Sequence, residues 1–320
     1  MTDELFVSEQ IIQKIEKFDS IIFDCDGVLV DIRKSYDFAI NKTISAIMKD
    51  LFDDDVNDIV NSKILYGLKS SGGFNDEVAV VYTAVMTLVA SKKTTTPFQK
   101  LITNVIENSN ESGINSIDDY FIKSNIDLTE IKNKLDYKNS RKESYIHRMF
   151  NQLFYGPKLY QEIFDEQSSF SEKSLIDKDE IVLDTSLMSK LKNRFEEKIS
   201  TVTGRGIFAF SYSMKEFLDD FDIEHSVFLE DRSLELAKPN PDSLIESILG
   251  INSKCSLYVG DSMEDLKMVE KCNEQGYDVS FCGIYGSSDE PELKYELFRK
   301  NNASFILESI QGLPKALNLV

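Results

Sequence analysis

The sequence contains little cysteine and little histidine, which limits the metal chemistry it can support. Of its 320 residues, four are cysteine and two are histidine. The cysteines form no Cys-x-x-Cys pair, so we do not expect a zinc cluster built from Cys and His ligands. Sparse cysteine in a long chain is typical of a reducing compartment, and we expect a cytoplasmic location.

Long apolar runs and an excess of positive charge are also missing. No apolar run approaches the roughly 18 residues that span a bilayer, and the acidic first ten residues lack the basic and apolar parts of a signal peptide. Lys and Arg number 36 against 55 Asp and Glu, a formal net charge of −19. We therefore expect neither nucleic acid nor a membrane as a partner. A phosphate site stays possible in an acidic chain, because a bound cation can reverse the local field.

The chain does have enough apolar residues, 42%, for a packed core. Short apolar runs that are typical of buried strands occur at 20–23, 199–202, 225–229, 256–259, 279–284 and 304–307. After residue 184 these runs alternate with helical patterns, which indicates parallel βαβ units in a doubly wound sheet.

The long segment between the first two runs has a different, helical character. Apolar residues recur at helical spacing from residue 36 to 51 and again from 78 to 90. We therefore predict an α/β core, residues 1–31 and 183–320, interrupted by a mainly α-helical domain of residues 32–182. The polar stretch 107–143 is expected to be irregular.

Polar residues follow several of the predicted strands. Ligands of an open parallel sheet bind at the carboxyl ends of its strands, so we expect these residues to converge. Clustered carboxylates require a cation or a proton among them, and oxygen ligands without Cys or His favour Mg²⁺. A lysine and a hydroxyl suit a phosphoryl group, and the whole set predicts metal-assisted phosphoryl transfer. The residues are Asp24 and Asp26 in DCDG, Thr203 and Gly204 in TGRG, Lys238 in AKPNP, and Asp261 and Asp265 in GDSMED.

These four motifs, in this order on a βα pattern, resemble those of the haloacid-dehalogenase superfamily. The resemblance implies a Rossmann-like core, with a helical cap inserted between the first two motifs. It also implies a Mg²⁺-dependent phosphatase that acts on a small phosphorylated substrate. Asp24 would be the nucleophile that forms an aspartyl-phosphate and would also ligate the metal. Asp26 would be the general acid/base, with its backbone carbonyl on the metal.

The other motif residues take their implied roles from the same resemblance. Thr203, Gly204 and Lys238 would hold the phosphoryl oxygens, and Lys238 would also restrain the charge on Asp24. Asp261 would ligate the metal, and Asp265 would do so directly or through water. Superfamily members that displace halide lack the second acid of the first motif, so its presence here favours phosphatase or phosphomutase chemistry.

Alternatives to this interpretation stay open at the level of the sequence. The same acids serve a phosphomutase, and a noncatalytic binding protein can keep the fold. For substrate specificity, the candidates are Asn75 and Asp76 in a glycine turn, and Arg205. For Asn75 and Asp76 a helix cap is the favoured role, and Arg205 equally suits a salt bridge between cap and core. Cys25 is interpreted as a small buried spacer, and the substrate and the oligomeric state are left open.

Overall fold

The computed structural model describes residues 5–74, 76–138 and 143–319, and the chain divides into two compact units. The core unit comprises Met1–Ile32 and Asp179–Val320, and the helical unit comprises Arg33–Lys178. The boundaries differ from the expected ones by one residue (32 against 31) and by four (179 against 183). Within the described ranges, no helix is both long and apolar enough to cross a membrane.

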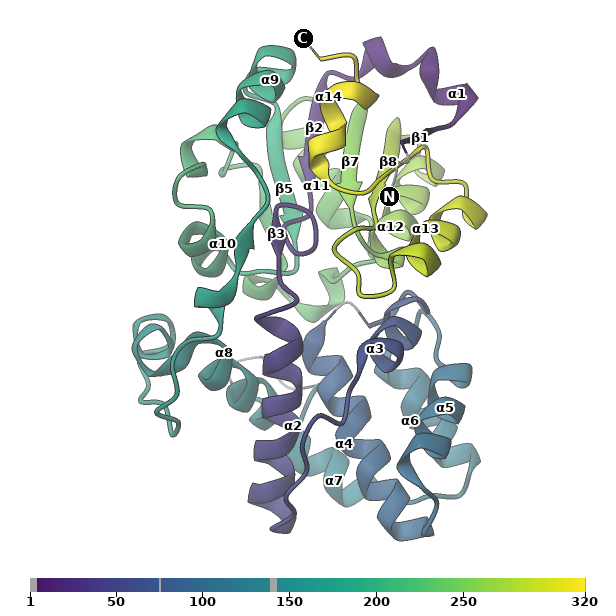
Figure 1. Cartoon of the computed structure of the whole chain (residues 1–320), viewed down its shortest axis with the longest axis vertical. Coiled ribbons are helices and arrows are strands. Elements are labelled where there is room, and N and C mark those ends of the chain that lie inside the picture. The colour runs from purple at the N-terminus through teal and green to yellow at the C-terminus, as the bar shows by residue number, and fades with distance from the viewer. Residues whose placement is uncertain (1–4, 75, 139–142, 320) are drawn as a thin grey trace. The chain divides into compact units, whose positions relative to one another are not determined.

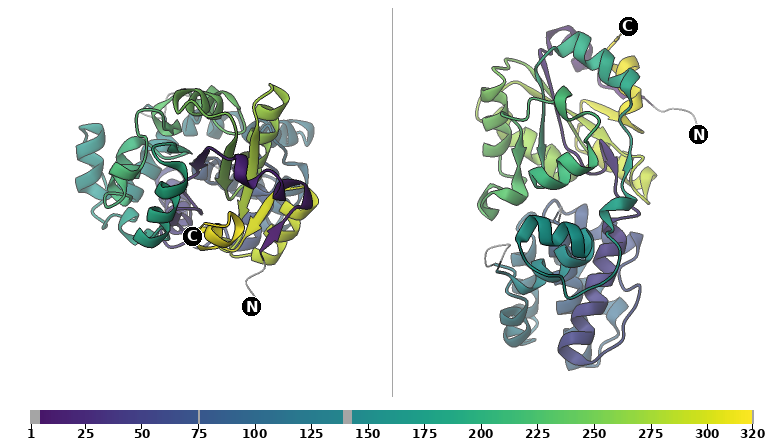
Figure 2. Two further views of the ribbon diagram at one scale, coloured as in Figure 1. Left: turned by 90° about the horizontal axis from the view of Figure 1, so that it is seen from above. Right: turned by 90° about the vertical axis from the view of Figure 1, so that its left-hand side faces the viewer.

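In the core unit, seven strands of the described residues form one sheet with helices on both faces (Figures 1 and 2). The strand order is β1-β9-β8-β7-β2-β5-β6, and all neighbours are parallel except β1 and β9. From β2 the chain proceeds outward through β5 and β6, then crosses to β7 and proceeds outward through β8 and β9. The predicted doubly wound α/β sheet is confirmed. The strands are β1 (Phe6–Val7), β2 (Ser20–Phe23), β5 (Ile199–Thr203), β6 (Val227–Phe228), β7 (Ser256–Gly260), β8 (Val279–Ile284) and β9 (Phe305–Leu307).

The helices of the core unit bury alternate residues of the central strands. Ile22, Val202 and Tyr258 belong to one apolar cluster with residues of α11, α12 and α13. Successive side chains of a strand point to opposite faces, so Ile21 and Phe23, both fully buried, lie on the other face. The helices are α1 (Glu9–Ile12), α9 (Thr185–Phe195), α10 (Ile207–Ser213), α11 (Asp242–Gly250), α12 (Met263–Glu274), α13 (Pro291–Lys300) and α14 (Leu313–Ala316).

A short antiparallel ladder joins the two chain segments that lead to and from the helical unit. Strand β3 (Val30–Asp31) pairs with β4 (Glu180–Ile181), and Asp31 lies opposite Glu180. Residues 30 and 31 are held in this ladder, and the first helix of the insertion begins at Tyr36.

The helical unit packs around α4, which is buried on all sides from Val78 to Ala90. An all-round apolar helix belongs in the centre of a bundle. The neighbouring helices are amphipathic, and Tyr36 of α2 stacks on Phe154 of α8 with ring centroids 4.3 Å apart. The helices are α2 (Tyr36–Phe52), α3 (Ser62–Lys69), α4 (Glu77–Thr94), α5 (Phe98–Asn108), α6 (Ile114–Lys123), α7 (Thr129–Leu135) and α8 (Tyr145–Phe164).

The expectation of an irregular stretch at 107–143 was wrong for most of its described residues. Helices α6 and α7 occupy much of it. Ile114, Ile117 and Phe121 are buried along one face of α6, and Ile131 and Leu135 are buried along one face of α7. A few apolar residues at helical spacing are sufficient to anchor a helix against a bundle, although the remaining positions are polar.

Candidate active site

Asp24 lies directly after β2, the strand between β7 and β5. Its backbone N–H donates to the carbonyl of Val259 at 2.8 Å, and its Oδ1 accepts the N–H of Cys25 at 2.7 Å. Its side chain is 2% exposed, and Lys238 Nζ lies 3.0 Å from its Oδ2. The carboxylate is therefore buried and held at a fixed place at the carboxyl end of the central strand.

The loop after Asp24 bends tightly and lies close to the fourth motif, GDSMED. Three successive N–H groups, of residues 28–30, donate to the carbonyl of Cys25, whose side chain is fully buried. Gly27 has φ +73°, and a Cβ at this position would collide with the Asp261 carboxylate. Glycine is thus required both for the backbone conformation and for the close approach of Asp261.

Asp265 accepts hydrogen bonds from several groups and organises the fourth motif. Its Oδ1 accepts from Lys238 Nζ at 2.7 Å and from the Tyr258 hydroxyl at 2.9 Å. Its Oδ2 accepts from the N–H of Asp261 at 3.2 Å. The same oxygen accepts from the N–H of Ser262 at 3.0 Å and from its hydroxyl at 2.7 Å. Because Ser262 in turn accepts the Asp265 N–H, the pair forms a capping box that begins α12.

The structure brings three acids of the predicted metal site together. Asp24, Asp261 and Asp265 each offer one carboxylate oxygen, and these oxygens lie within 4.8 Å of one another. Lys294 Nζ, from α13, donates to Asp261 Oδ2 at 2.6 Å. The sequence gives no indication of Lys294, because it lies 33 positions from Asp261 in an ordinary amphipathic helix.

Burial and mutual repulsion set the charge state of these acids. The pKa of Asp24 is raised to about 8: burial is the largest cause, Lys238 opposes it, and the carboxylates of Asp265, Asp261 and Asp26 add to it. Burial also opposes ionisation of Asp265, but Lys238 and Ser262 bring its pKa below the ordinary value. The positive charge of Lys238 therefore compensates the negative charge of Asp265. Asp24 requires another positive charge nearby to ionise at neutral pH.

The second motif places a buried hydroxyl beside open space. Thr203 is the last residue of β5 and is fully buried, and its Oγ1 accepts the N–H of Arg205 at 3.3 Å. The next residue, Gly204, is exposed, and no atom lies within 4 Å of the position that a Cβ would take. The end of this strand therefore leaves room for a ligand beside its backbone.

Arg205 points into the protein and contacts the second acid of the first motif. Its side chain is 0% exposed, and its Nε donates to Asp26 Oδ1 at 2.5 Å. Its Nη1 lies 2.8 Å from Asp179 Oδ2. The Asp26 side chain is 19% exposed and that of Asp179 is 4% exposed. Asp179 was not predicted at this site, because it belongs to no motif.

The specificity candidates of the glycine turn belong to the helical unit. Asn75 lies outside the described residues. Asp76 is the N-cap of α4: its Oδ1 accepts the N–H of Val78 at 2.9 Å. Its Oδ2 accepts the hydroxyl of Tyr137 at 2.9 Å. These contacts fit a helix cap, and a role of Asp76 in specificity stays a prediction.

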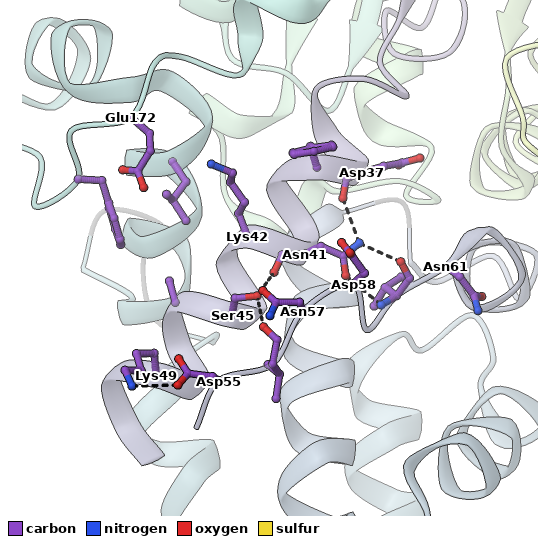
Figure 3. Close-up of a pocket in the computed structure, with 16 residues that line it drawn as sticks. Asp37, Asn41, Lys42, Ser45, Lys49, Asp55, Asn57, Asp58, Asn61 and Glu172 are labelled. Atoms are coloured by element: carbon purple, nitrogen blue, oxygen red, sulfur yellow. Dashed lines mark hydrogen bonds and ion pairs between the residues drawn. The ribbon is translucent and has the colours of Figure 1, made fainter. Parts of the chain in front are cut away.

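A groove of about 710 Å³ lies in the helical unit, along α2 (Figure 3). Several of its polar groups bind the chain itself. Asn41 bonds both the N–H and the carbonyl of Val60, Ser45 donates to the carbonyl of Val56, and Lys49 pairs with Asp55. Since these groups already have partners, we assign no ligand to this groove.

Solved structures of other proteins resemble most of the chain. Phosphatase Tt82 from Thermococcus thioreducens has a TM-score of 0.57 at 22% sequence identity, over 87% of this chain and 98% of that chain. The chain shares the fold of this phosphatase. At this identity the similarity establishes the fold and not the reaction.

Two further structures match more weakly. A structure from Bacteroides fragilis, assigned as a haloacid dehalogenase-like hydrolase, has a TM-score of 0.47 at 14% identity, over 87% of this chain and 92% of that chain. A hydrolase from Pseudomonas syringae has a TM-score of 0.49 at 13% identity, over 94% of this chain and 98% of that chain. No protein-family model and no curated protein sequence matches the chain.

Proposed function

We propose that this chain is a Mg²⁺-dependent phosphatase that hydrolyses a small phosphorylated metabolite through an aspartyl-phosphate on Asp24. One observation carries the proposal above all: Asp24 is buried at the end of the central strand, 3.0 Å from Lys238, within a cluster of carboxylates. A likeness in fold to a phosphatase supports the same conclusion.

The donor set fits a hard divalent cation. Asp24, Asp261 and Asp265 offer carboxylate oxygens at one place, and Gly27 leaves room for the Asp261 side chain. Oxygen ligands without thiolate or imidazole suit Mg²⁺. Asp24, Asp261 and the backbone carbonyl of Asp26 would hold the ion, and Asp265 would do so directly or through water. The bound ion supplies positive charge that lets a carboxylate approach a phosphoryl anion.

In the first half of the reaction, Asp24 attacks phosphorus. A bond forms between an Asp24 oxygen and phosphorus, and the bond between phosphorus and the leaving oxygen breaks. Asp26 gives its proton to that oxygen, which therefore leaves as an alcohol. Thr203, Gly204 and Lys238 hold the phosphoryl oxygens, and the ammonium group of Lys238 balances their charge.

In the second half, water attacks the aspartyl-phosphate. Asp26, now a carboxylate, accepts the proton of the attacking water, and the bond between Asp24 and phosphorus breaks. Inorganic phosphate is released and Asp24 is again a carboxylate. Asp26 thus acts as the general acid in the first half of the reaction and as the general base in the second.

The test is a phosphate-release screen over sugar, nucleotide, amino-acid and polyol phosphates, together with p-nitrophenyl phosphate. We expect release from at least one ester with Mg²⁺ and none with a chelator. No release from any ester would contradict the proposal. Isomerisation without phosphate release, on addition of a bisphosphorylated activator, would instead identify a phosphomutase.

A further inference from the structure

We propose that Arg205 is a positioning residue for the acid/base Asp26, and that Asp179 holds Arg205 in place for this task. The inference rests on the proposed function, because it assigns a role in the proton transfers of that reaction. It also replaces the view of Arg205 as a contact for the substrate.

Contacts through two of its nitrogens fix the guanidinium group. Nε donates to Asp26 Oδ1 at 2.5 Å, while Nη1 donates to Ser213 Oγ at 2.8 Å. Nη1 also lies 2.8 Å from Asp179 Oδ2, which accepts the Ser213 hydroxyl at 3.0 Å. Arg205 is thus bound to acids through two different nitrogens. A planar guanidinium held in this way has a fixed orientation, and it fixes the carboxylates it contacts.

Burial argues against a direct contact between Arg205 and a substrate. The Arg205 side chain is 0% exposed, and it is among the largest fully buried side chains of the described residues. To reach a substrate anion, the guanidinium would have to leave Asp26 and Asp179. That movement would separate buried charges, which is strongly unfavourable.

Stability alone does not account for a buried arginine at this place. Buried ion pairs can often be replaced by apolar side chains with no loss of stability. A proton donor, by contrast, has to lie within about 2.6–3.2 Å of the leaving oxygen. Asp26 lies on a tight loop next to Gly27 and not within a strand. The contact of its Oδ1 with the fixed Arg205 guanidinium holds the side chain from outside this loop.

Asp179 connects this anchor to the segment that returns from the helical unit. It is the first residue of the second core segment and directly precedes β4. Strand β4 pairs with β3, which follows the loop that carries Asp26. The Arg205 guanidinium therefore joins the two chain segments that flank the insertion, in addition to orienting Asp26.

The decisive experiment is a double-mutant cycle. We would measure kcat/KM for Arg205→Met, Asp26→Asn and the double variant, using the alkyl phosphate with the highest turnover in the screen. Arg205→Met should lower kcat/KM roughly 10-fold or more, a part of the usual effect of general acid catalysis. In the Asp26→Asn background the same change should have almost no further effect, because Arg205 acts through Asp26.

The leaving group provides a second, independent measurement. p-Nitrophenol leaves without the help of an acid, so kcat/KM for p-nitrophenyl phosphate should fall much less in Arg205→Met than for the alkyl ester. Asp179→Asn should show the same pattern with smaller losses, and Arg205→Lys should restore part of the activity. Arg194→Lys is the control, because the Arg194 guanidinium donates to the backbone carbonyls of Ile15 and Glu16 and contacts neither acid.

The outcomes separate the inference from the proposed function. A wild-type chain that releases no phosphate from any ester overturns both. An active wild type in which the losses multiply in the double variant, or are equal for the two esters, overturns the role of Arg205 alone. If thermal unfolding shows that Arg205→Met is not folded, the same cycle is measured with Asp179→Asn in its place and decides between these outcomes.

Discussion

The two units of the molecule use their buried polar residues differently. In the core unit, buried charges from separate segments meet at the strand ends: Lys238 contacts both Asp24 and Asp265. In the helical unit, some buried polar groups bond within one helix, as when Thr83 and Thr87 donate to carbonyls four positions earlier in α4. Others bond between helices, as when Tyr82 of α4 donates to Asp118 of α6. The core unit gathers charged groups at the strand ends, where we propose that the reaction takes place, whereas the helical unit satisfies polar groups within its own packing.

The largest effect should come from Asp24, the proposed nucleophile. We expect Asp24→Asn to lower kcat by roughly 10³-fold or more, the scale seen when a nucleophile is removed. Circular dichroism and thermal unfolding should show an intact fold, because the amide has the same shape as the carboxylate. Substantial residual turnover in this variant would rule out an aspartyl-phosphate on Asp24.

Replacing a buried acid of the helical unit should lower stability and leave turnover unchanged. Asp118 accepts the hydroxyl of Tyr82 at 2.7 Å and also pairs with Lys132. Asp118→Ala would leave the Tyr82 hydroxyl without this acceptor, and we expect a loss of about 1–3 kcal/mol in the free energy of unfolding. Turnover of p-nitrophenyl phosphate by the folded variant should not change.

The control for this variant is Asp119→Ala, which alters an exposed neighbour. Urea denaturation gives the free energies, and a phosphate assay below the midpoint gives turnover. A large loss of turnover in folded Asp118→Ala would mean that buried charge serves the reaction in both units, and the contrast between them would fail.

A variant of Lys294 tests whether the acids of the core unit bind a metal cation. Its ammonium group contacts Asp261 and so competes with a metal for that carboxylate. Lys294→Met should tighten Mg²⁺ binding about tenfold, which corresponds to roughly 1.4 kcal/mol. Isothermal titration measures the affinity without turnover, with Lys300→Met on the exposed side of the same helix as the matched control. Unchanged or weaker binding in Lys294→Met would contradict competition between the lysine and the metal.

The smallest effect concerns the pH dependence of stability without metal. The folded chain keeps Asp24 protonated up to about pH 8, whereas the ordinary pKa is 3.8. The folded state therefore binds more protons between these values. The stability that this proton gives is present below pH 3.8 and is lost as pH rises toward about 8.

Asp24→Asn should remove this dependence. With a chelator present, its unfolding midpoint should exceed that of the wild type by about 2–4 °C near the upper end of this range, the shift that about 1 kcal/mol produces in a domain of this size. Parallel curves of midpoint against pH for the two proteins would show that Asp24 is ionised in the folded, metal-free chain.

The sheet was predictable from the sequence because its signals are local. The run at 20–23 is apolar and short, and the structure has β2 at the same residues. The polar residues after β2, β5 and β7 could be placed together because parallel strands end at one edge of a sheet. Helices α6 and α7 were missed because their few apolar anchors stand among many polar residues.

The remaining parts of the candidate site depend on tertiary packing. Asp179, Tyr258 and Lys294 reach the site from places that no motif marks. The orientation of Arg205 likewise could not be predicted from the sequence. The residues around TGRG give no indication of whether its side chain faces a ligand or a buried acid. Such partners become visible only when distant segments are seen side by side.

The β3–β4 ladder has a consequence for how this protein can be taken apart. Because Asp31 lies opposite Glu180, the insertion leaves and rejoins the core at neighbouring points, as a long loop on a hairpin does. A short turn could therefore replace residues 33–178 and close the ladder without stretching the backbone. The helical unit is in this sense a module, which recombination could exchange for another without rebuilding the fold beneath it.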